Sequence, residues 1–211
     1  NVNTRRTNAV LGPLSMTAYG QGWIEDELCG CTFRIPADAF YQTNPAQTER
    51  LYQIAIDMAR LREGDRVLDA YCGIGTIGLI ASRDAREVIS VELNPDAVRD
   101  AVTNAKRNQI KNVSFYQNDA GAFMVSMAEK GEKADVVFMD PPREGSTPAF
   151  IESVARMAPK RIVYVSCNPE TMARDLALLT QKGYRAEGFT PVDMFPHSAH
   201  CEVVGSLVRV K

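Results

Sequence analysis

The stretch "RVLDAYCGIGTIGL" (residues 66–79) starts as a short apolar strand, passes through closely spaced glycines and continues as a helical segment. Gly73 and Gly75 allow the backbone to turn tightly and to approach a bound ligand closely. Together with Gly78 they match the pattern G-x-G-x-x-G, which places a ligand where a strand meets a helix in nucleotide-binding sheets. We therefore predict an α/β fold with a ligand at this turn.

The same alternation of strand and helix continues along the chain. Short, mostly apolar runs are separated by helical stretches such as 95–108, which is typical of a parallel sheet covered on both faces. Two last runs, 184–192 and 202–210, are separated only by a loop, which predicts an antiparallel hairpin at one edge. The preceding runs span residues 66–71, 87–92, 113–118, 135–140 and 161–166. We predict a Rossmann-like class I methyltransferase fold with a seven-stranded, mostly parallel sheet.

The residues before this sheet have a different character. They lack a helical period, so we place a short β-rich segment at residues 1–43 and a methyltransferase domain at 44–211. A helix should open this domain, because Asn44 is a suitable N-cap and Pro45 suits the first helical position. Gly64 is expected to end that helix. The candidate β-pieces are VLGPL (10–14), AYGQGWIED (18–26) and CTFRIPADAFY (31–41).

Composition narrows the function classes. With 24 basic and 26 acidic residues, the net charge of −2 gives no support to a strongly electrostatic nucleic-acid binder. The five cysteines lack the spacing that is typical of disulfide-rich proteins, which favours a reducing, cytoplasmic setting. Cys29 and Cys31 lack a second pair of cysteines that would complete a metal site. There is no apolar run long enough to span a membrane. Because the first residue is Asn1 rather than Met, we expect a fragment that lacks an N-terminal module. We also expect it to be a monomer.

Polar or glycine-rich residues lie at the end of each of the five predicted strands that precede the hairpin. Ligands bind outside the carboxyl ends of the strands in open α/β sheets. Glu92 follows Asp69 at about the spacing at which an acid reaches ribose hydroxyls. Asp69 suits a ligand that carries a cationic amino acid. This favours S-adenosylmethionine over NAD, which remains the alternative. With S-adenosylmethionine as the ligand, Asp119 would be placed for the adenine amine and Tyr71 for packing on the ligand.

The segment DPPR (140–143) places a carboxylate in a rigid loop, because two prolines restrict the backbone. Methyltransferases that act on exocyclic amines use a similar loop, followed by an aromatic residue that stacks on the base. Arg143 occupies this place and disfavours that chemistry. The alternative interpretation is an ordinary turn.

The segment YVSCNPETMARD (164–175) ends a predicted strand at Cys167 and opens a helix at Asn168 and Pro169. One interpretation is a buried structural cysteine. The other is a nucleophilic thiol whose pKa is lowered at the positive end of a helix. Beside a methyl donor, such a thiol can add to C6 of uracil so that C5 attacks the methyl group. A base must then remove the C5 proton.

Candidates for this base lie in DMFPHSAHCE (193–202), between the last two predicted strands. They are Asp193, His197, His200 and Glu202. We favour Glu202, because it opens the last strand and is therefore mounted more rigidly than the loop residues. The alternative is a solvated hairpin loop. The histidine spacing is too irregular to indicate a metal site, and we expect none.

Together, LDAYCGIGTIGL, DPPR, IVYVSCNPETMARD and DMFPHSAHCE resemble the motifs of the RNA 5-methyluridine (uracil-C5) methyltransferase family, and the likeness is greatest to its 23S ribosomal RNA members. FYQTNPAQTERLY (40–52) resembles the segment that leads into the family's catalytic domain. The resemblance implies that S-adenosylmethionine is the cofactor, that Cys167 is the nucleophile and that Glu202 is the general base. The residues that it places at the donor are Gln42, Tyr71, Gly73, Thr76, Glu92, Asp119 and Asp140, and those at the target base are Asp140, Arg143, Phe195 and His197.

Members of this family usually carry an N-terminal OB-like RNA-binding domain, and often an iron–sulfur cluster on a cysteine-rich stretch. Neither pattern occurs in this sequence, so we expect no cluster here and expect an additional domain to supply much of the phosphate affinity. RNA is the implied partner, with ribosomal RNA favoured over transfer RNA. The alternatives are cytosine-C5 methylation of RNA and a non-catalytic RNA-binding or donor-sensing module.

Overall fold

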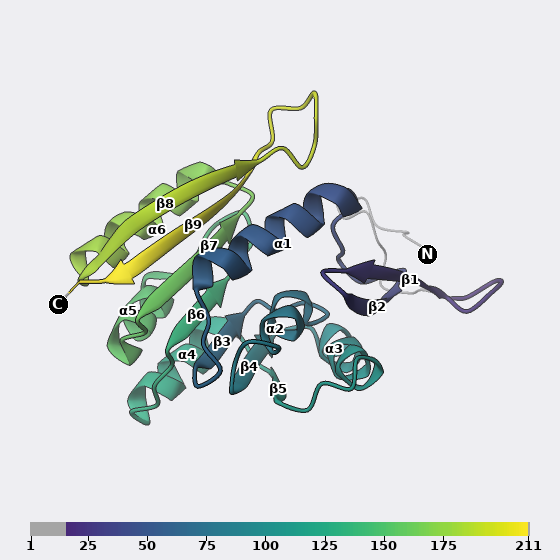
Figure 1. The fold of residues 1–211 in the computed structure, drawn as a ribbon, viewed down its shortest axis with the longest axis horizontal. Helices are drawn as coiled ribbons and strands as arrows, with labels where there is room; N and C mark the ends of the chain where they lie inside the picture. Colours follow the sequence, from purple (N-terminus) through teal and green to yellow (C-terminus); the bar gives the residue numbers. More distant parts are fainter. Residues whose placement is uncertain (1–15, 211) are drawn as a thin grey trace.

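The central sheet has the strand order β5-β4-β3-β6-β7-β9-β8 in the computed structural model, which describes residues 16–210 (Figure 1). The strands β3 to β7 are parallel, whereas β9 is antiparallel to both β7 and β8. The strand bounds are β3 Arg66–Ala70, β4 Glu87–Glu92, β5 Val113–Gln117, β6 Val136–Met139, β7 Arg161–Ser166, β8 Tyr184–Val192 and β9 Glu202–Arg209. The predicted seven-stranded sheet with a C-terminal antiparallel hairpin is confirmed.

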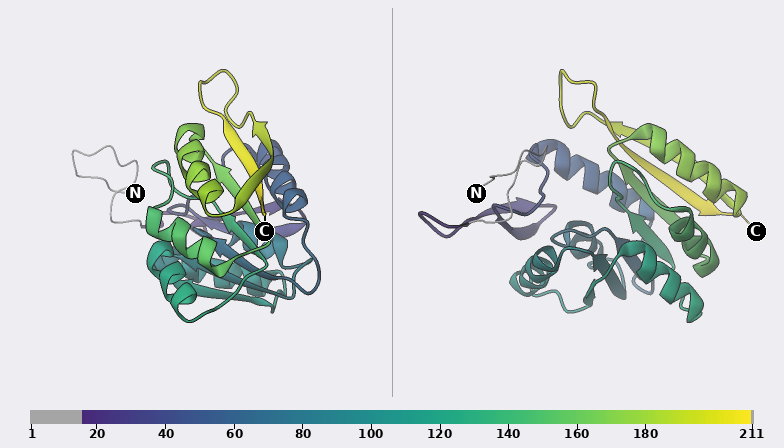
Figure 2. Two further views of the ribbon diagram at one scale, coloured as in Figure 1. Left: turned by 90° about the vertical axis from the view of Figure 1, so that its left-hand side faces the viewer. Right: turned by 180° about the vertical axis from the view of Figure 1, so that it is seen from behind.

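Helices cover both faces of this sheet (Figures 1 and 2). On one face lie α1 (Pro45–Ala59), α2 (Thr76–Ala81) and α3 (Pro95–Arg107), and on the other lie α4 (Ala120–Glu129), α5 (Pro148–Met157) and α6 (Pro169–Gln181). Successive strand residues point to opposite faces, so Val67 joins the core on the α1 side and Leu68 joins the core on the α5 side. Within residues 16–210, no helix is both long enough and apolar enough to cross a bilayer.

A separate two-stranded antiparallel sheet, formed by β1 (Trp23–Leu28) and β2 (Cys31–Pro36), packs beside α3. It confirms the β-rich character that we predicted for 18–41, while the candidate piece at 10–14 lies outside the described residues. Its buried side chains belong to the same hydrophobic core as α1 and α2; they are Leu28, Cys31, Phe33 and Ile35. The hairpin is therefore packed into the main core.

The helix α1 begins as the sequence predicts, but it ends earlier. The Asn44 side chain accepts a hydrogen bond from the Gln47 N–H at 3.3 Å, and Pro45 is the first helical residue. The expected end at Gly64 is wrong, because Arg60 takes the left-handed conformation (φ 48°) directly after Ala59. This turn directs the chain back toward β3.

The strand order places the ligand site and brings the ends of β7 and β9 together. From β3, the chain adds β4 and β5 on one side and β6 and β7 on the other, and sheets of this kind bind ligands at the carboxyl end of the strand where the direction changes. In the β7–β9 register Ser166 is opposite Val203. The first residue of β9, Glu202, therefore lies beside the end of β7, where Cys167 follows.

Candidate active site

A cavity of about 580 Å³ opens at the carboxyl ends of β3, β4, β5, β6 and β7. This volume lies within the range of sites that bind small molecules. Its walls come from the strand ends and from the segment that precedes α1: Phe40, Gln42, Tyr71, Gly73, Val91, Glu92, Leu93, Asp119, Ala120, Asp140, Pro141, Pro142, Cys167 and Glu202. Segments that are far apart in the sequence thus meet around one space.

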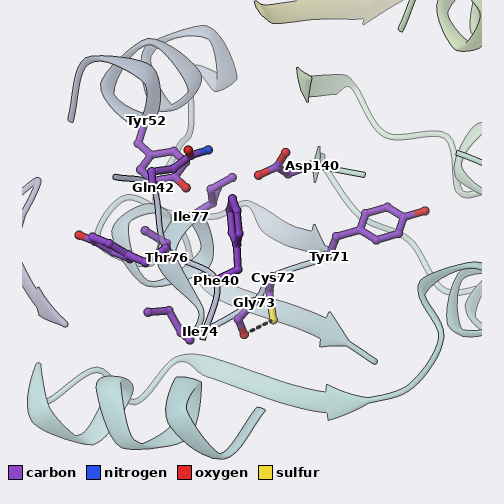
Figure 3. A pocket seen from close by; sticks show the side chains of 11 residues that line it. Phe40, Gln42, Tyr52, Tyr71, Cys72, Gly73, Ile74, Thr76, Ile77 and Asp140 are labelled. Carbon is purple, nitrogen blue, oxygen red and sulfur yellow. Dashed lines mark hydrogen bonds between the residues drawn. The ribbon is translucent and has the colours of Figure 1, made fainter. Parts of the chain in front are cut away.

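Most of the residues proposed from the sequence line this cavity. They are Gln42, Tyr71, Gly73, Glu92, Asp119, Asp140, Cys167 and Glu202. Thr76 instead lines an adjoining cavity of about 50 Å³, and four of the eight residues also line this smaller space: Gln42, Tyr71, Gly73 and Asp140 (Figure 3). Thr76 is therefore a neighbour of the main cavity rather than part of its wall.

Three residues expected at the target base are not in the cavity wall. The side chain of Arg143 is exposed, and its carbonyl accepts hydrogen bonds from Asn168 Nδ2 at 3.1 Å and Thr171 Oγ1 at 3.2 Å. Phe195 and His197 are exposed in the loop between β8 and β9, which projects beyond the sheet (Figure 1). In this structure these three residues are exposed and none of them lines the cavity.

Cys167 is an exposed cysteine at the end of β7, followed by Asn168 as the N-cap of α6. The proposed lowering of its pKa by the helix is wrong. Partial burial raises the pKa of the thiol, the carboxylates of Glu202 and Asp140 raise it further, and the nearby Arg143 only partly opposes them. The two acids destabilise a thiolate at this position, so the free thiol is the favoured form.

The two carboxyl groups beside Cys167 are themselves perturbed. Glu202 is buried at the start of β9, and this burial raises its pKa. Burial raises the pKa of Asp140 to about 8, with further contributions from Glu202 and Asp69. At neutral pH Asp140 is therefore mostly protonated and can both donate and accept a hydrogen bond.

The loop after β3 is shaped by backbone conformation. Tyr71, Gly73 and Gly75 all have positive φ, at 66°, 54° and 88°. A Cβ atom on Gly73 would meet nothing within 4 Å, so this glycine faces open space. Glu92 fixes the loop: its Oε2 accepts the Gly73 N–H at 3.0 Å, while its Oε1 accepts the Asn94 N–H at 2.8 Å.

Asp69 does not face the ligand space as the sequence suggested. It is 1% exposed and accepts hydrogen bonds from the Gly78 N–H at 2.9 Å and from Ser90 Oγ at 3.4 Å. Burial raises the pKa of Asp69 to about 7 against the effect of these two donors. A Cβ atom on Gly78 would lie 2.7 Å from the Asp69 carboxylate, so this glycine serves close packing of α2 on the sheet.

The sequence interpretation missed several apolar residues in the wall, of which two are largely exposed. Phe40 and Leu93 line the cavity although they are 79% and 63% exposed. Their positions carried a signal, because Phe40 lies two residues before Gln42 and Leu93 directly follows Glu92. An exposed aromatic ring at the cavity rim offers a flat apolar surface for a planar ligand.

Within residues 16–210, no group of three or more histidine, cysteine, aspartate or glutamate side chains is arranged to hold a metal ion. The wall combines acids, glycine backbone and apolar side chains. Such a wall suits an organic ligand with hydroxyl, amine and cationic groups.

Comparison with known proteins agrees with this geometry. The chain is 46% identical over 99% of its length to a protein of Lactiplantibacillus plantarum named as an uncharacterized RNA methyltransferase, and equally identical, over 99%, to one of Streptococcus mutans with the same name. It covers 46% of each of these relatives, so it spans about half their length. Among solved structures, it is similar to the Pyrococcus abyssi tRNA (uracil-54, C5)-methyltransferase in complex with S-adenosyl-L-homocysteine, with a TM-score of 0.81, 32% identity and coverage of 98% of this chain and 49% of that one.

The family model described as tRNA (Uracil-5-)-methyltransferase matches residues 24–210. This range contains the whole central sheet and every residue in the cavity wall. The chain therefore belongs to the tRNA (uracil-5-)-methyltransferase family, whose members have the fold of S-adenosylmethionine-dependent methyltransferases.

Proposed function

We propose that this chain carries the catalytic centre of an S-adenosylmethionine-dependent methyltransferase that modifies C5 of uracil in RNA. The observation that carries the proposal is the shared cavity of Cys167 and Glu202, which also contains the loop after β3. A nucleophilic thiol and a base can thus reach one ring beside a donor site. The family match and the similarity to a uracil-C5 methyltransferase structure support the same reaction.

The donor half of the site is formed by the ends of β3, β4 and β5. We assign Glu92 to the ribose hydroxyls and Asp119 to the adenine amine, with Tyr71 and the open backbone at Gly73 beside them. The Asp119 carboxylate already accepts the Ala122 N–H at 2.8 Å as an N-cap, which fixes its direction. S-adenosylmethionine, when bound, supplies an electrophilic methyl group.

The acceptor half contains Cys167, Glu202 and Asp140. The thiol of Cys167 must lose its proton, which passes to solvent, and its sulfur then forms a bond to C6 of the uracil ring while the electron pair of the C5–C6 double bond moves onto C5 and O4. C5 is then electron-rich and takes the methyl group, and the donor is left as S-adenosylhomocysteine. The Glu202 carboxylate then removes the C5 proton, and the electron pair of that C–H bond restores the double bond as the C6–S bond breaks. Asp140, protonated at neutral pH, is suited to hydrogen-bond the pyrimidine edge.

The reaction also requires that the target base leave its stack, because C6 is not accessible to a thiol inside a helix. Exposed Phe40 at the rim offers a surface for a displaced base. We propose ribosomal RNA as the favoured substrate on the motif resemblance. The Pyrococcus abyssi protein is named for a transfer RNA position, so transfer RNA is the competing outcome.

A methylation assay tests the proposal. The chain and the full-length protein are incubated with methyl-labelled S-adenosylmethionine and with ribosomal or transfer RNA from cells that lack the gene, and the nucleosides are analysed by mass spectrometry. The proposal predicts labelled 5-methyluridine. Labelled 5-methylcytidine would instead indicate the cytosine reaction, and donor binding by the full-length protein without methylation would indicate a sensing module.

A further inference from the structure

The loop between β6 and α5 is held by main-chain hydrogen bonds to another element. This loop, residues 140–147, begins at Asp140, and its next two residues are prolines without an N–H donor. Its one internal turn is the bond from the Gly145 N–H to the Pro142 carbonyl at 2.8 Å. Ser146, near the end of the loop, is buried, so its main-chain groups need partners from outside the loop, because buried backbone groups are costly when unpaired.

Those partners come from α6, the helix that directly follows Cys167. Asp175 is completely buried, and its Oδ2 accepts hydrogen bonds from the Ser146 N–H at 2.7 Å and from Tyr164 Oη at 2.8 Å. Its Oδ1 accepts from Arg174 Nε at 2.9 Å and from Arg174 Nη2 at 2.7 Å. All lone-pair directions of this carboxylate are therefore directed at the loop, at β7 or at the arginine.

Arg174 extends the same contact. Its Nη2 donates to the carbonyl of Glu144 at 2.9 Å and to that of Ser146 at 3.1 Å. At the start of the helix, Asn168 Nδ2 and Thr171 Oγ1 both donate to the Arg143 carbonyl, as described above. The first two turns of α6 thus bind the loop backbone at residues 143, 144 and 146.

We propose that Asp175 is a positioning residue of the methyl-transfer site: with Arg174 it holds the loop 140–146 in a fixed relation to Cys167. The proposal deepens the proposed function and rests on it. Asp175 is not in the cavity wall, so it acts through other residues. One of its partners, Tyr164, lies three residues before the nucleophile, and another, Ser146, lies six residues after Asp140.

The contact also reaches the donor side. Ser146 Oγ lies 3.5 Å from Tyr71 Oη, and the Tyr71 ring packs on Phe150 with centroids 5.5 Å apart. Gly145 shows how tightly the pieces fit: with φ 76°, a Cβ atom there would lie 2.6 Å from Arg174 Nη2 and 2.8 Å from Asp175 Oδ2. A side chain at this position would displace the pair from the loop.

The competing interpretation is that Asp175 only stabilises the fold and does not position the site. Asp65 provides the matched control, because it is also a buried aspartate (5% exposed) that accepts a main-chain N–H, that of Arg62 at 3.0 Å. It lies just before β3, at the opposite end of the sheet from the cavity. Asp65→Asn should therefore lower stability without disturbing the site.

The test compares Asp175→Asn, Gly145→Ala and Asp65→Asn, each made in the chain of residues 1–211 and in the full-length protein. The temperature is chosen so that unfolding curves show all variants folded. We expect the single-turnover rate of methylation to fall about 10- to 100-fold in Asp175→Asn and Gly145→Ala, as for an ångström-sized misplacement. We expect donor KM to change by less than about threefold, because the change is in positioning. Asp65→Asn should retain the wild-type rate.

A second readout does not depend on activity. The pH midpoint of Cys167 alkylation by iodoacetamide reports the charges that surround the thiol, namely Glu202, Asp140 and Arg143. Release of the loop moves Asp140 and Arg143 away; Asp140 has the larger effect, so the midpoint should fall in both Asp175→Asn and Gly145→Ala. Gly145→Ala removes no charged group, so a shift in this variant reports movement of the loop rather than the loss of the Asp175 charge.

The outcomes separate the two proposals. If the wild type methylates and Asp175→Asn matches Asp65→Asn in rate and in alkylation midpoint, the positioning role is wrong while the proposed function stands. If the wild type does not methylate but both loop variants shift the midpoint, the proposed function fails and the positional link between the loop and Cys167 remains.

Discussion

The carboxylates near Cys167 affect its thiol more strongly than the nearby guanidinium of Arg143 does. Desolvation, Glu202 and Asp140 all raise its pKa, so a nucleophilic thiolate is a minor species in the free site. Any change that removes one of these negative charges should favour the thiolate. The strength of the nucleophile is therefore linked to the protonation of the base.

Glu202→Gln removes one of the named charges next to the thiol. We predict that the pH midpoint for alkylation of Cys167 by iodoacetamide falls relative to wild type, because the Coulombic cost of the thiolate is reduced. Mass spectrometry of the peptide that contains residue 167 measures the rate at each pH. Glu170→Gln is the control, an exposed carboxylate three residues away that should leave the midpoint unchanged. A midpoint that stays in place in Glu202→Gln would contradict this electrostatic link.

Asp69 provides a test through stability. Its pKa is about 7 in the folded chain, against about 3.9 for a free aspartate, so the native state binds more protons than the unfolded state between these pH values. The contribution of the Asp69 carboxyl to the free energy of unfolding is therefore lost as the pH rises from about 3.9 to about 7. We predict that Asp69→Asn gains stability relative to wild type as pH rises from 4 to 7, by at most roughly 1.4 kcal/mol per pH unit, and levels off above.

Urea unfolding at pH 5, 6, 7 and 8 measures this difference. For Asp84→Asn, at an exposed position, the difference in free energy of unfolding from wild type should not change over the same pH range. A difference for Asp69→Asn that also stays constant would contradict the prediction, because it would mean that the Asp69 carboxyl is solvated. The orientation of Asp69 could have been predicted from the sequence, because strand alternation puts it on the same face as Val67, toward α2 and away from the ligand.

Among the helices and strands, the contact between β2 and α3 was the least visible in the sequence. Asn104 and Asn108 are one helical turn apart, and their side-chain amides pair with the main chain of β2 as a further strand would. Asn104 Oδ1 accepts the Arg34 N–H at 2.8 Å, and Asn108 Oδ1 accepts the Thr32 N–H at 2.8 Å. The two asparagines satisfy one open edge of the small sheet.

We predict that Asn104→Ala lowers the free energy of unfolding by about 1–3 kcal/mol, because it leaves the partly buried main-chain N–H and carbonyl of Arg34 without these partners. Hydrogen exchange should show faster exchange at the Arg34 amide, and denaturant unfolding measures the global loss. Thr103→Ala, a neighbouring polar residue on the same helix, should have a smaller effect. Equal losses in the two variants would show that the asparagine does not hold the hairpin.

The elements that the sequence predicted well have local causes. The N-caps at Asn44, Asn94 and Asn168, each followed by proline, mark helix starts without any tertiary information. The end of α1 could not be predicted in this way, because Arg60 adopts a left-handed conformation that is usually taken by glycine. That conformation depends on how the next segment packs.

For the molecule as a whole, the charge balance bears on RNA binding. The net charge is −2, and the chain spans about half the length of the relatives that it matches. We predict that the chain binds S-adenosylmethionine in calorimetry but has a much weaker RNA affinity, with a shallower salt dependence, than the full-length protein, because it neutralises fewer phosphates. Equal salt slopes for the two proteins would contradict this division.

The position of the site could be predicted, but several of its properties could not. Ligands bind at the carboxyl ends of strands, so Glu92, Asp140 and Cys167 could be brought together on topology alone. The direction of the thiol pKa depends on which charges surround it, and Asp175 acquires its partners only through tertiary packing. Neither property has a signature in the spacing of residues.

Detection of a covalent bond between Cys167 and the uracil ring is the most direct test of the proposed mechanism. Full-length Glu202→Gln protein, incubated with S-adenosylmethionine and unmodified substrate RNA, should accumulate an RNA–protein adduct that survives denaturation and that maps by mass spectrometry to residue 167. Cys167→Ala should give neither adduct nor methylated RNA. Continued methylation by Cys167→Ala, or an adduct attached to a different residue, would contradict the assignment of this thiol as the nucleophile.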